Sequence, residues 1–248
     1  METKAIASEL WHVIGDDLRM PGGFYMPSRA IAIRLPDRTL AIYSPIAIDD
    51  AMAAALAGLG EIAHLIVPSR LHCQFAAEAA ERWPRAIVHA APGVADKVPG
   101  LRIDRDLVAD PEPAWRDVLA LERIGGAPKA NEVVVLHRPT GTLICADLLF
   151  HVTEPANLRT RVVLALMGTG GRKLAQSRAW SMLRKDKAAA RASVERILAW
   201  PIARVAPCHG DAIEIDAAGL APLMRRLCGQ IPTPSTASRR PEAASDLG

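Results

Sequence analysis

Short apolar runs separated by turn residues divide the first half of the chain into predicted strands and helices. Pro36-Asp37-Arg38 joins two such runs and is a hairpin signal. Asp49 is placed as the N-cap of a helix that Gly60 closes. The predicted strands are 30–35, 39–44, 61–68 and 85–91, and the predicted helices are 50–59 and 74–83. The continuously apolar strands 61–68 and 85–91 indicate a sheet covered on both faces.

The second half begins with consecutive strands and then becomes helical. The run 138–141, Arg-Pro-Thr-Gly, fits a type I turn between two strongly apolar strands. The predicted strands are 120–125, 131–137, 142–150 and 202–207, and helical patterns cover 156–199 and 217–228. Two strand-rich halves that each carry helices are compatible with two packed mixed sheets with helices outside.

Length and composition favour one folded domain. The chain has 248 residues, half of them hydrophobic, and a net charge of +3. We expect a single domain over 1–229 with a helical insertion at about 156–199. The segment 230–248 is rich in Pro, Ser, Ala and charged residues, so we expect a disordered tail there.

Composition and the absence of common motifs argue against several classes of protein. The four cysteines are too few and too scattered for a disulfide scaffold, and the start of the chain lacks the pattern of a signal peptide. The longest apolar run is too short for a membrane span. We therefore expect a cytoplasmic protein. The chain contains no nucleophile elbow, phosphate loop or C-x-x-C motif.

Polar residues at strand ends are the candidates for chemistry. His72 and Cys73 follow one predicted strand, Asp147 ends another, and His209 and Asp211 follow a third. The carboxyl ends of strands are where layered α/β folds build their sites. His, Asp and thiolate side chains are also ordinary ligands of Zn and Fe. His151, four residues past Asp147, is a further candidate for the same cavity.

The order of these pieces resembles the metallo-β-lactamase superfamily over roughly residues 8–229. The runs 131–150, NEVVVLHRPTGTLICADLLF, and 207–211, PCHGD, look most like a divergent lactamase-like branch. The resemblance implies an αββα four-layer sandwich. In that family a strand–helix loop carries H-x-H-x-D-H, a later turn carries G-H-T-x-G, an Asp bridges two metals, and a final turn supplies the last His.

The match to the family's metal motifs is partial. Pro68 and Arg70 stand where the first two His would be. His72 stands where the Asp would be, and Cys73 where the third His would be. The turn aligned with G-H-T-x-G, at 126–129, holds no His.

Asp147 and His209 match the bridging Asp and the last His. With help from His72 or Cys73 they imply at most one metal, Zn or Fe, and a hydrolase acting on an ester, lactone or phosphoester. The alternative is a catalytically inactive scaffold that holds no metal and binds a ligand or protein partner in the former active-site cleft. In that case Arg70 would replace the cation and bind a carboxylate or phosphate, and Asp147, His209 and Asp211 would form a polar network. We place His151 and Asp211 with Arg70 as substrate-binding candidates.

The insertion carries a local excess of positive charge. Residues 157–196 contain ten Lys or Arg and two acidic residues. A solvated helix face explains this, and a basic lid that selects an anionic small molecule is the functional interpretation. The few aromatic residues among the charges argue against nucleic-acid binding. The oligomeric state is left open.

Overall fold

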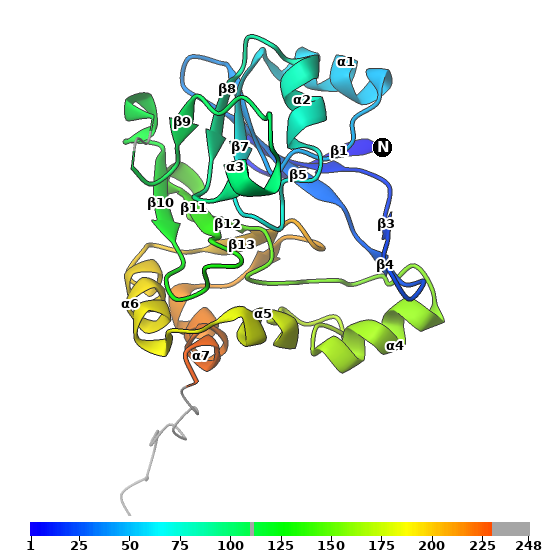
Figure 1. Cartoon of the computed structure of the whole chain (residues 1–248), viewed down its shortest axis with the longest axis vertical. Coiled ribbons are helices and arrows are strands. Elements are labelled where there is room, and N and C mark those ends of the chain that lie inside the picture. The colour runs from blue at the N-terminus through cyan, green and yellow to red at the C-terminus, as the bar shows by residue number, and fades with distance from the viewer. Residues whose placement is uncertain (110–111, 230–248) are drawn as a thin grey trace, which may run out of the picture.

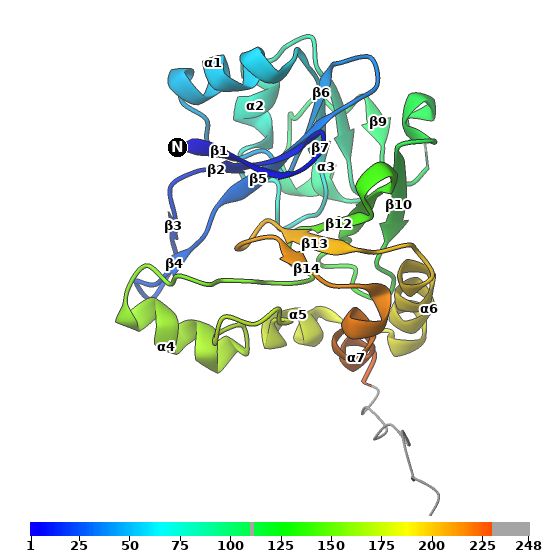
Figure 2. The same ribbon diagram turned by 180° about the vertical axis from the view of Figure 1, so that it is seen from behind.

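Two β-sheets lie in the middle of the molecule with helices on both outer sides (Figures 1 and 2). The structure is a computed structural model, and it describes residues 1–109 and 112–229. The predicted tail over 230–248 lies outside the described residues. None of the helices in the described ranges is long and apolar enough to cross a membrane.

The first sheet has seven strands in the order β1-β2-β5-β6-β7-β8-β9. Antiparallel pairing joins β1 through β6, and parallel pairing joins β6 through β9. The strands are β1 (Glu2–Ala7), β2 (Leu10–Ile14), β5 (Arg29–Arg34), β6 (Leu40–Tyr43), β7 (Ile62–Val67), β8 (Ile87–Ala90) and β9 (Arg105–Asp106).

The second sheet has five strands in the order β10-β11-β12-β13-β14, and only β12 and β13 pair in parallel. Its strands are β10 (Leu119–Arg123), β11 (Val133–His137), β12 (Thr142–Cys145), β13 (Arg204–Pro207) and β14 (Ile213–Glu214). A separate two-stranded hairpin consists of β3 (Leu18–Arg19) and β4 (Tyr25–Met26).

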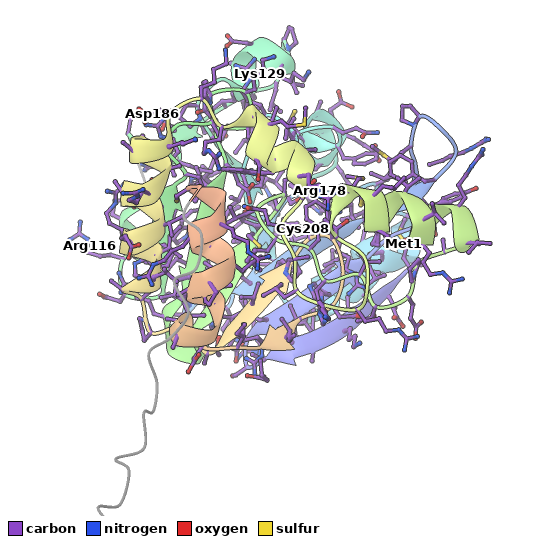
Figure 3. All side chains as sticks on the ribbon, turned by 90° about the horizontal axis from the view of Figure 1, so that it is seen from below. Met1, Arg116, Lys129, Arg178, Asp186 and Cys208 are labelled. Atoms are coloured by element: carbon purple, nitrogen blue, oxygen red, sulfur yellow. The ribbon has the colours of Figure 1, made fainter. Side chains whose placement is uncertain are left out.

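The helices form two groups, one covering the first sheet and the other on the opposite side of the molecule (Figures 1 and 2). The first group is α1 (Asp50–Leu59), α2 (Ala76–Arg82) and α3 (Val94–Lys97). The second is α4 (Leu158–Met167), α5 (Arg178–Leu183), α6 (Lys187–Leu198) and α7 (Ala217–Leu227), which spread across one face in Figure 3. Two 3₁₀ turns, η1 (Pro113–Trp115) and η2 (Arg138–Thr140), complete the elements.

Each helix of the second group starts at a polar cap. The side chains of Asn157, Ser177, Asp186 and Asp216 accept hydrogen bonds from backbone N–H groups in the first turns of α4 to α7. Asp49 does the same for α1, as its position in the sequence predicts.

The core between the two sheets is aliphatic. Ile31 and Ile42 of the first sheet belong to the same buried cluster as Val135 and Ile144 of the second. The fully buried Tyr43 donates its hydroxyl hydrogen to the Val133 carbonyl oxygen at 2.9 Å, and this hydrogen bond links the two sheets. A second cluster packs β11, β12 and β13 against α6 and α7. The layer order is therefore helices, sheet, sheet, helices, and the predicted αββα architecture is confirmed.

The structure contains strands that the sequence pattern does not predict. β1 and β2 form an edge of the first sheet, and β3, β4, β9 and β14 are further short strands outside the predicted ranges. The strand predicted over 142–150 ends at Cys145, so the following residues form a loop. The predicted type I turn is a 3₁₀ turn over Arg138–Thr140, with Gly141 in the left-handed region at φ 61°.

Candidate metal centre

Three side chains from two sheets meet at strand ends. His72 follows β7, Asp147 follows β12 and His209 follows β13. The two imidazole Nε2 atoms are 3.0 Å apart. Asp147 Oδ2 lies 3.3 Å from His72 Nε2, and Asp147 Oδ1 lies 3.3 Å from His209 Nε2. The two nitrogen atoms and the Asp147 carboxylate thus form a triangle of donor groups, in which each nitrogen faces a different carboxylate oxygen.

The orientation of His209 is set by its neighbours. Its Nδ1 lies 2.7 Å from the Pro27 carbonyl oxygen, which can only accept a hydrogen bond. Nδ1 therefore carries the proton, and in the neutral ring Nε2 turns a lone pair toward the other two side chains. The Phe150 ring stacks on the imidazole with a centroid separation of 4.9 Å and an interplanar angle of 16°.

His72 and Asp147 form an ion pair at the same point. His72 Nδ1 lies 2.8 Å from Ser44 Oγ, which leaves Nε2 to face Asp147. Burial acts to lower the pKa of His72, but the Asp147 carboxylate outweighs it and raises that pKa well above its ordinary value. Burial would raise the pKa of Asp147, and the charge of His72 lowers it instead. Asp147 Oδ2 is buried and lies 3.3 Å from His72 Nε2 without an aligned hydrogen bond, so this contact is electrostatic.

Glu132, which the sequence analysis did not single out, supports the loop that carries Asp147. It is fully buried, and its Oε1 accepts hydrogen bonds from the backbone N–H groups of Ala146 at 2.8 Å and Leu148 at 3.1 Å. Its Oε2 accepts from Trp180 Nε1 at 3.1 Å. Burial and the nearby Asp147 charge raise the pKa of Glu132 to about 7. The only sequence signal for this residue is an acid at the start of a strongly apolar strand.

The triangle lies in the wall of a cavity of about 340 Å³. The side chains that line it are mostly apolar, and they come from the β3–β4 hairpin, the start of α2, the segment after β12, α4 and α5. His72, Asp147 and His209 all line it. The candidate ligands are therefore accessible to a small molecule.

Solved structures of similar shape were found, although no protein-family model and no curated protein matches the sequence. A metallo-β-lactamase from Pontibacter korlensis superposes with a TM-score of 0.63 at 15% identity, covering 92% of this chain and 99% of that one. The FIM-1 metallo-β-lactamase from Pseudomonas aeruginosa, in its mono-zinc form, gives 0.59 at 18% identity, covering 92% and 94%. A metallo-β-lactamase from Erythrobacter litoralis gives 0.61 at 16% identity, covering 90% and 96%. The chain has the metallo-β-lactamase fold.

In the loop after β7 of this metallo-β-lactamase fold, Cys73 and Arg70 do not join the candidate metal centre, where the sequence analysis places a ligand and an anion-binding group. The Cys73 thiol is buried and donates to the Arg70 carbonyl oxygen at 3.3 Å, so it lies apart from the three clustered donor atoms. The Arg70 guanidinium pairs with Asp96, with Nη1 and Oδ2 3.2 Å apart. Among the residues described as lining the cavity, neither Cys73 nor Arg70 is present.

His151 and Asp211 bond to each other, and Asp211 also bonds to Arg29 of β5. His151 Nδ1 lies 2.9 Å from the Asp211 carbonyl oxygen. The Asp211 carboxylate accepts from Arg29 Nη1 at 2.8 Å and from Thr153 Oγ1. Burial acts to raise the pKa of Asp211, but these two hydrogen bonds outweigh it and lower that pKa to about 2. In the described part of the chain neither residue is among those that line the cavity.

Gly210 makes this arrangement possible. It has φ 118°, and a Cβ at this position would lie 2.0 Å from the His151 carbonyl oxygen. The backbone at position 210 therefore lies so close to His151 that only glycine, which has no Cβ, fits there.

A second group of donor atoms lies away from this site. His64 Nδ1 and His89 Nε2 are 3.0 Å apart, and a Glu112 carboxylate oxygen lies within 4.8 Å of both. Both imidazoles pack against Trp115, and Glu112 Oε2 lies 3.2 Å from Arg105 Nε. The two imidazoles bond to each other and pack on Trp115, and Glu112 pairs with Arg105, so we interpret the group as a structural cluster.

Proposed function

We propose that this protein is a metal-dependent hydrolase that uses one metal ion held by His72, Asp147 and His209. The observation that carries the proposal is the spacing of the donor atoms: the two Nε2 atoms are 3.0 Å apart, and each lies 3.3 Å from one of the two Asp147 oxygens. Ligand atoms placed about 2.0–2.1 Å from one zinc ion at tetrahedral angles are separated by roughly 3.3 Å. The three side chains are therefore spaced as ligands of a single ion.

The electrostatics of the cluster also fit a cation. The His209 Nε2 lone pair faces Asp147 Oδ1 at 3.3 Å, and Asp147 Oδ2 accepts no aligned hydrogen bond. Without a cation there, the raised pKa of His72 means that a proton on its ring fills this role. A metal ion would replace that proton. Two imidazoles and one carboxylate form a donor set typical of Zn and Fe, which are the two metals we propose.

The residues around the ligands hold the donor atoms in place. Ser44 and the Pro27 carbonyl bind the outer nitrogen atoms of His72 and His209, which is how metal-binding imidazoles are usually oriented. Glu132 holds the Asp147 loop from behind. When bound, a divalent ion in such a site polarises a carbonyl group and lowers the pKa of water toward neutrality.

The comparisons support one ion rather than two. The FIM-1 structure is described as a mono-zinc form, and this chain retains only part of the family's two-metal motif. Three protein ligands leave a position open for water or substrate, which a catalytic site requires.

The experiment is metal analysis by elemental mass spectrometry after purification and after reloading with Zn, Fe or Mn. We expect about one equivalent in the wild type and its loss in Asp147→Ala and His209→Ala. Cys73→Ala is the matched control, because Cys73 adjoins His72 while its thiol bonds to Arg70; we expect it to retain the metal. Failure of the wild type to bind any of the three metals would overturn the proposal.

The second candidate is a metal-free binding scaffold, and one observation favours it. A protonated His72 and an ionised Asp147 form a complete ion pair without any metal. In that case the imidazole proton signals of His72 in NMR spectra would stay unchanged on addition of Zn. A shift of those signals with one equivalent of Zn would exclude this alternative.

A further inference from the structure

The cavity beside the candidate metal centre is lined mostly by apolar side chains, several of which keep part of their surface uncovered. Met20 and Phe24 come from the hairpin region, Met167 from α4 and Leu183 from α5. All four are only half-buried in the folded chain. Contiguous apolar surface left facing a cavity marks a binding site for an apolar group. The methionines add adaptability, since their unbranched side chains fit ligands of different shapes.

Outside the candidate metal centre, the described lining of the cavity offers no exposed and unpaired positive charge for an anion. Apart from the two imidazoles of that centre, its charged residues are Arg29 and Asp147. Asp147 belongs to the metal triangle, and Arg29 is 13% exposed with its Nη1 bound to Asp211. Within the described insertion, none of the ten Lys and Arg residues lines the cavity. A neutral ligand therefore fits this site better than the anionic one expected from the charge of the insertion.

We propose that the substrate is a neutral ester or lactone with a medium-length apolar acyl group, which occupies this cavity while its carbonyl group faces His72, Asp147 and His209. At ~30 Å³ per water-sized group, the cavity of 340 Å³ accepts on the order of ten such groups. In the reaction, water adds to the carbonyl carbon, the carbon–oxygen bond to the leaving alcohol breaks, and an acid and an alcohol form. This inference rests on the proposed hydrolase function.

The first test is a series of p-nitrophenyl esters from acetate to decanoate, assayed with the metal-loaded protein. Burial of each methylene group predicts a rise in kcat/KM of about three- to fourfold per added carbon until the cavity is full. A p-nitrophenyl hemisuccinate, which carries a free carboxylate, should be a poorer substrate than the butyrate ester. Equal rates along the series, or a preference for the hemisuccinate, would overturn the inference and leave the hydrolase proposal standing.

Two pairs of adjacent residues provide matched variants. Leu183→Gln and Met167→Gln place a polar group in the cavity wall. Met182→Gln and Leu166→Gln alter the neighbouring residues, which are 84% and 70% exposed. We expect the wall variants to reduce kcat/KM for the decanoate about tenfold or more and for the acetate little, and the outer variants to behave like the wild type. Equal effects of the inner and outer variants would contradict the assignment of the cavity.

A binding measurement separates this inference from the proposed function. Decanamide, a neutral probe, should bind to the wild type and to Asp147→Ala in calorimetry, and bind more weakly to Leu183→Gln. If decanamide binds to the wild type and to Asp147→Ala, and more weakly to Leu183→Gln, but no ester is hydrolysed, the cavity assignment stands and the hydrolase proposal fails. If decanamide does not bind to the wild type, the cavity assignment fails whatever the hydrolase assay shows.

Discussion

The Glu132 carboxylate brackets Asp147 by accepting hydrogen bonds from the backbone N–H groups on either side of it. Glu132 begins the segment that leads into β11, whereas Asp147 follows β12, so two neighbouring strands of one sheet cooperate in placing one candidate ligand. The second Glu132 oxygen accepts from Trp180 of α5, which lines the cavity. A single buried carboxylate therefore joins the candidate metal centre to the wall of the binding cavity.

Glu132→Gln should weaken metal binding while the protein remains folded. Glu132 Oε1 accepts both loop hydrogen bonds and Oε2 accepts from Trp180. In Gln one of these two positions holds an NH2 group that faces an N–H donor, which displaces the side chain and loosens the Asp147 loop. Changes in such outer residues typically cost about 10- to 100-fold in metal affinity. Competition titration with a zinc indicator measures the loss. Trp180→Phe is the control, since it leaves both loop hydrogen bonds in place; an unchanged affinity in Glu132→Gln would show that the loop holds itself.

Gly210→Ala should destabilise the fold and disturb His209. The residue has φ 118°, and the added Cβ would overlap the His151 carbonyl oxygen. Backbone strain and overlap of this kind cost about 2–4 kcal/mol. Urea unfolding measures the change. Gly58→Ala, in α1 with nothing within 4 Å of the added Cβ, should instead stabilise the fold by about 0.5–1 kcal/mol. A similar effect of both substitutions would contradict the close approach.

Stability should fall as the pH drops below about 6.5, because His89 is buried in its neutral form. Burial lowers the pKa of His89 to about 3, and His64 and Arg105 contribute to the decrease while Asp104 opposes it. The unfolded chain, with an ordinary histidine pKa, binds the proton first. Each such histidine lowers the free energy of unfolding by about 1.4 kcal/mol per pH unit between about pH 6.5 and 3.

His89→Phe should remove about one proton from this pH dependence. Phe keeps the contact with Trp115 and removes both ring nitrogens: Nδ1, which is buried without a partner, and Nε2, which lies 3.0 Å from His64 Nδ1. Urea unfolding between pH 7 and 4 compares the slopes of the two proteins. Parallel slopes would mean that the folded protein protonates His89 as readily as the unfolded chain does.

Arg70→Ala should leave stability, metal binding and hydrolysis close to wild type. The Arg70 side chain is 28% exposed, and it pairs with Asp96, whose side chain is 75% exposed. Surface ion pairs of this kind contribute about 0–1 kcal/mol. Calorimetric titration with phosphate and with acetate tests the other interpretation, in which Arg70 binds an anion. Loss of anion binding in Arg70→Ala would support that interpretation and the scaffold alternative.

The sequence by itself was enough to predict the layers of the fold and the three residues of the candidate metal centre. Apolar runs such as 131–137 predict buried strands, because a strand buried on both faces has apolar side chains at successive positions. His72, Asp147 and His209 each follow such a run, and the carboxyl ends of strands converge where sites are built. The structure brings these three together as their positions predict.

Only the tertiary structure decided which neighbours each polar side chain meets. Arg70 and Cys73 lie in the same loop as His72, yet Arg70 turns to Asp96 and the Cys73 thiol lies in the core. Glu132 reaches Trp180, a residue 48 positions away, which no local pattern encodes. The apolar cavity likewise gathers half-buried residues from β3–β4, α4 and α5, each of which reads in the sequence as an ordinary core position. Side-chain direction and long-range contact follow from how the layers pack, and a one-dimensional pattern of burial carries neither.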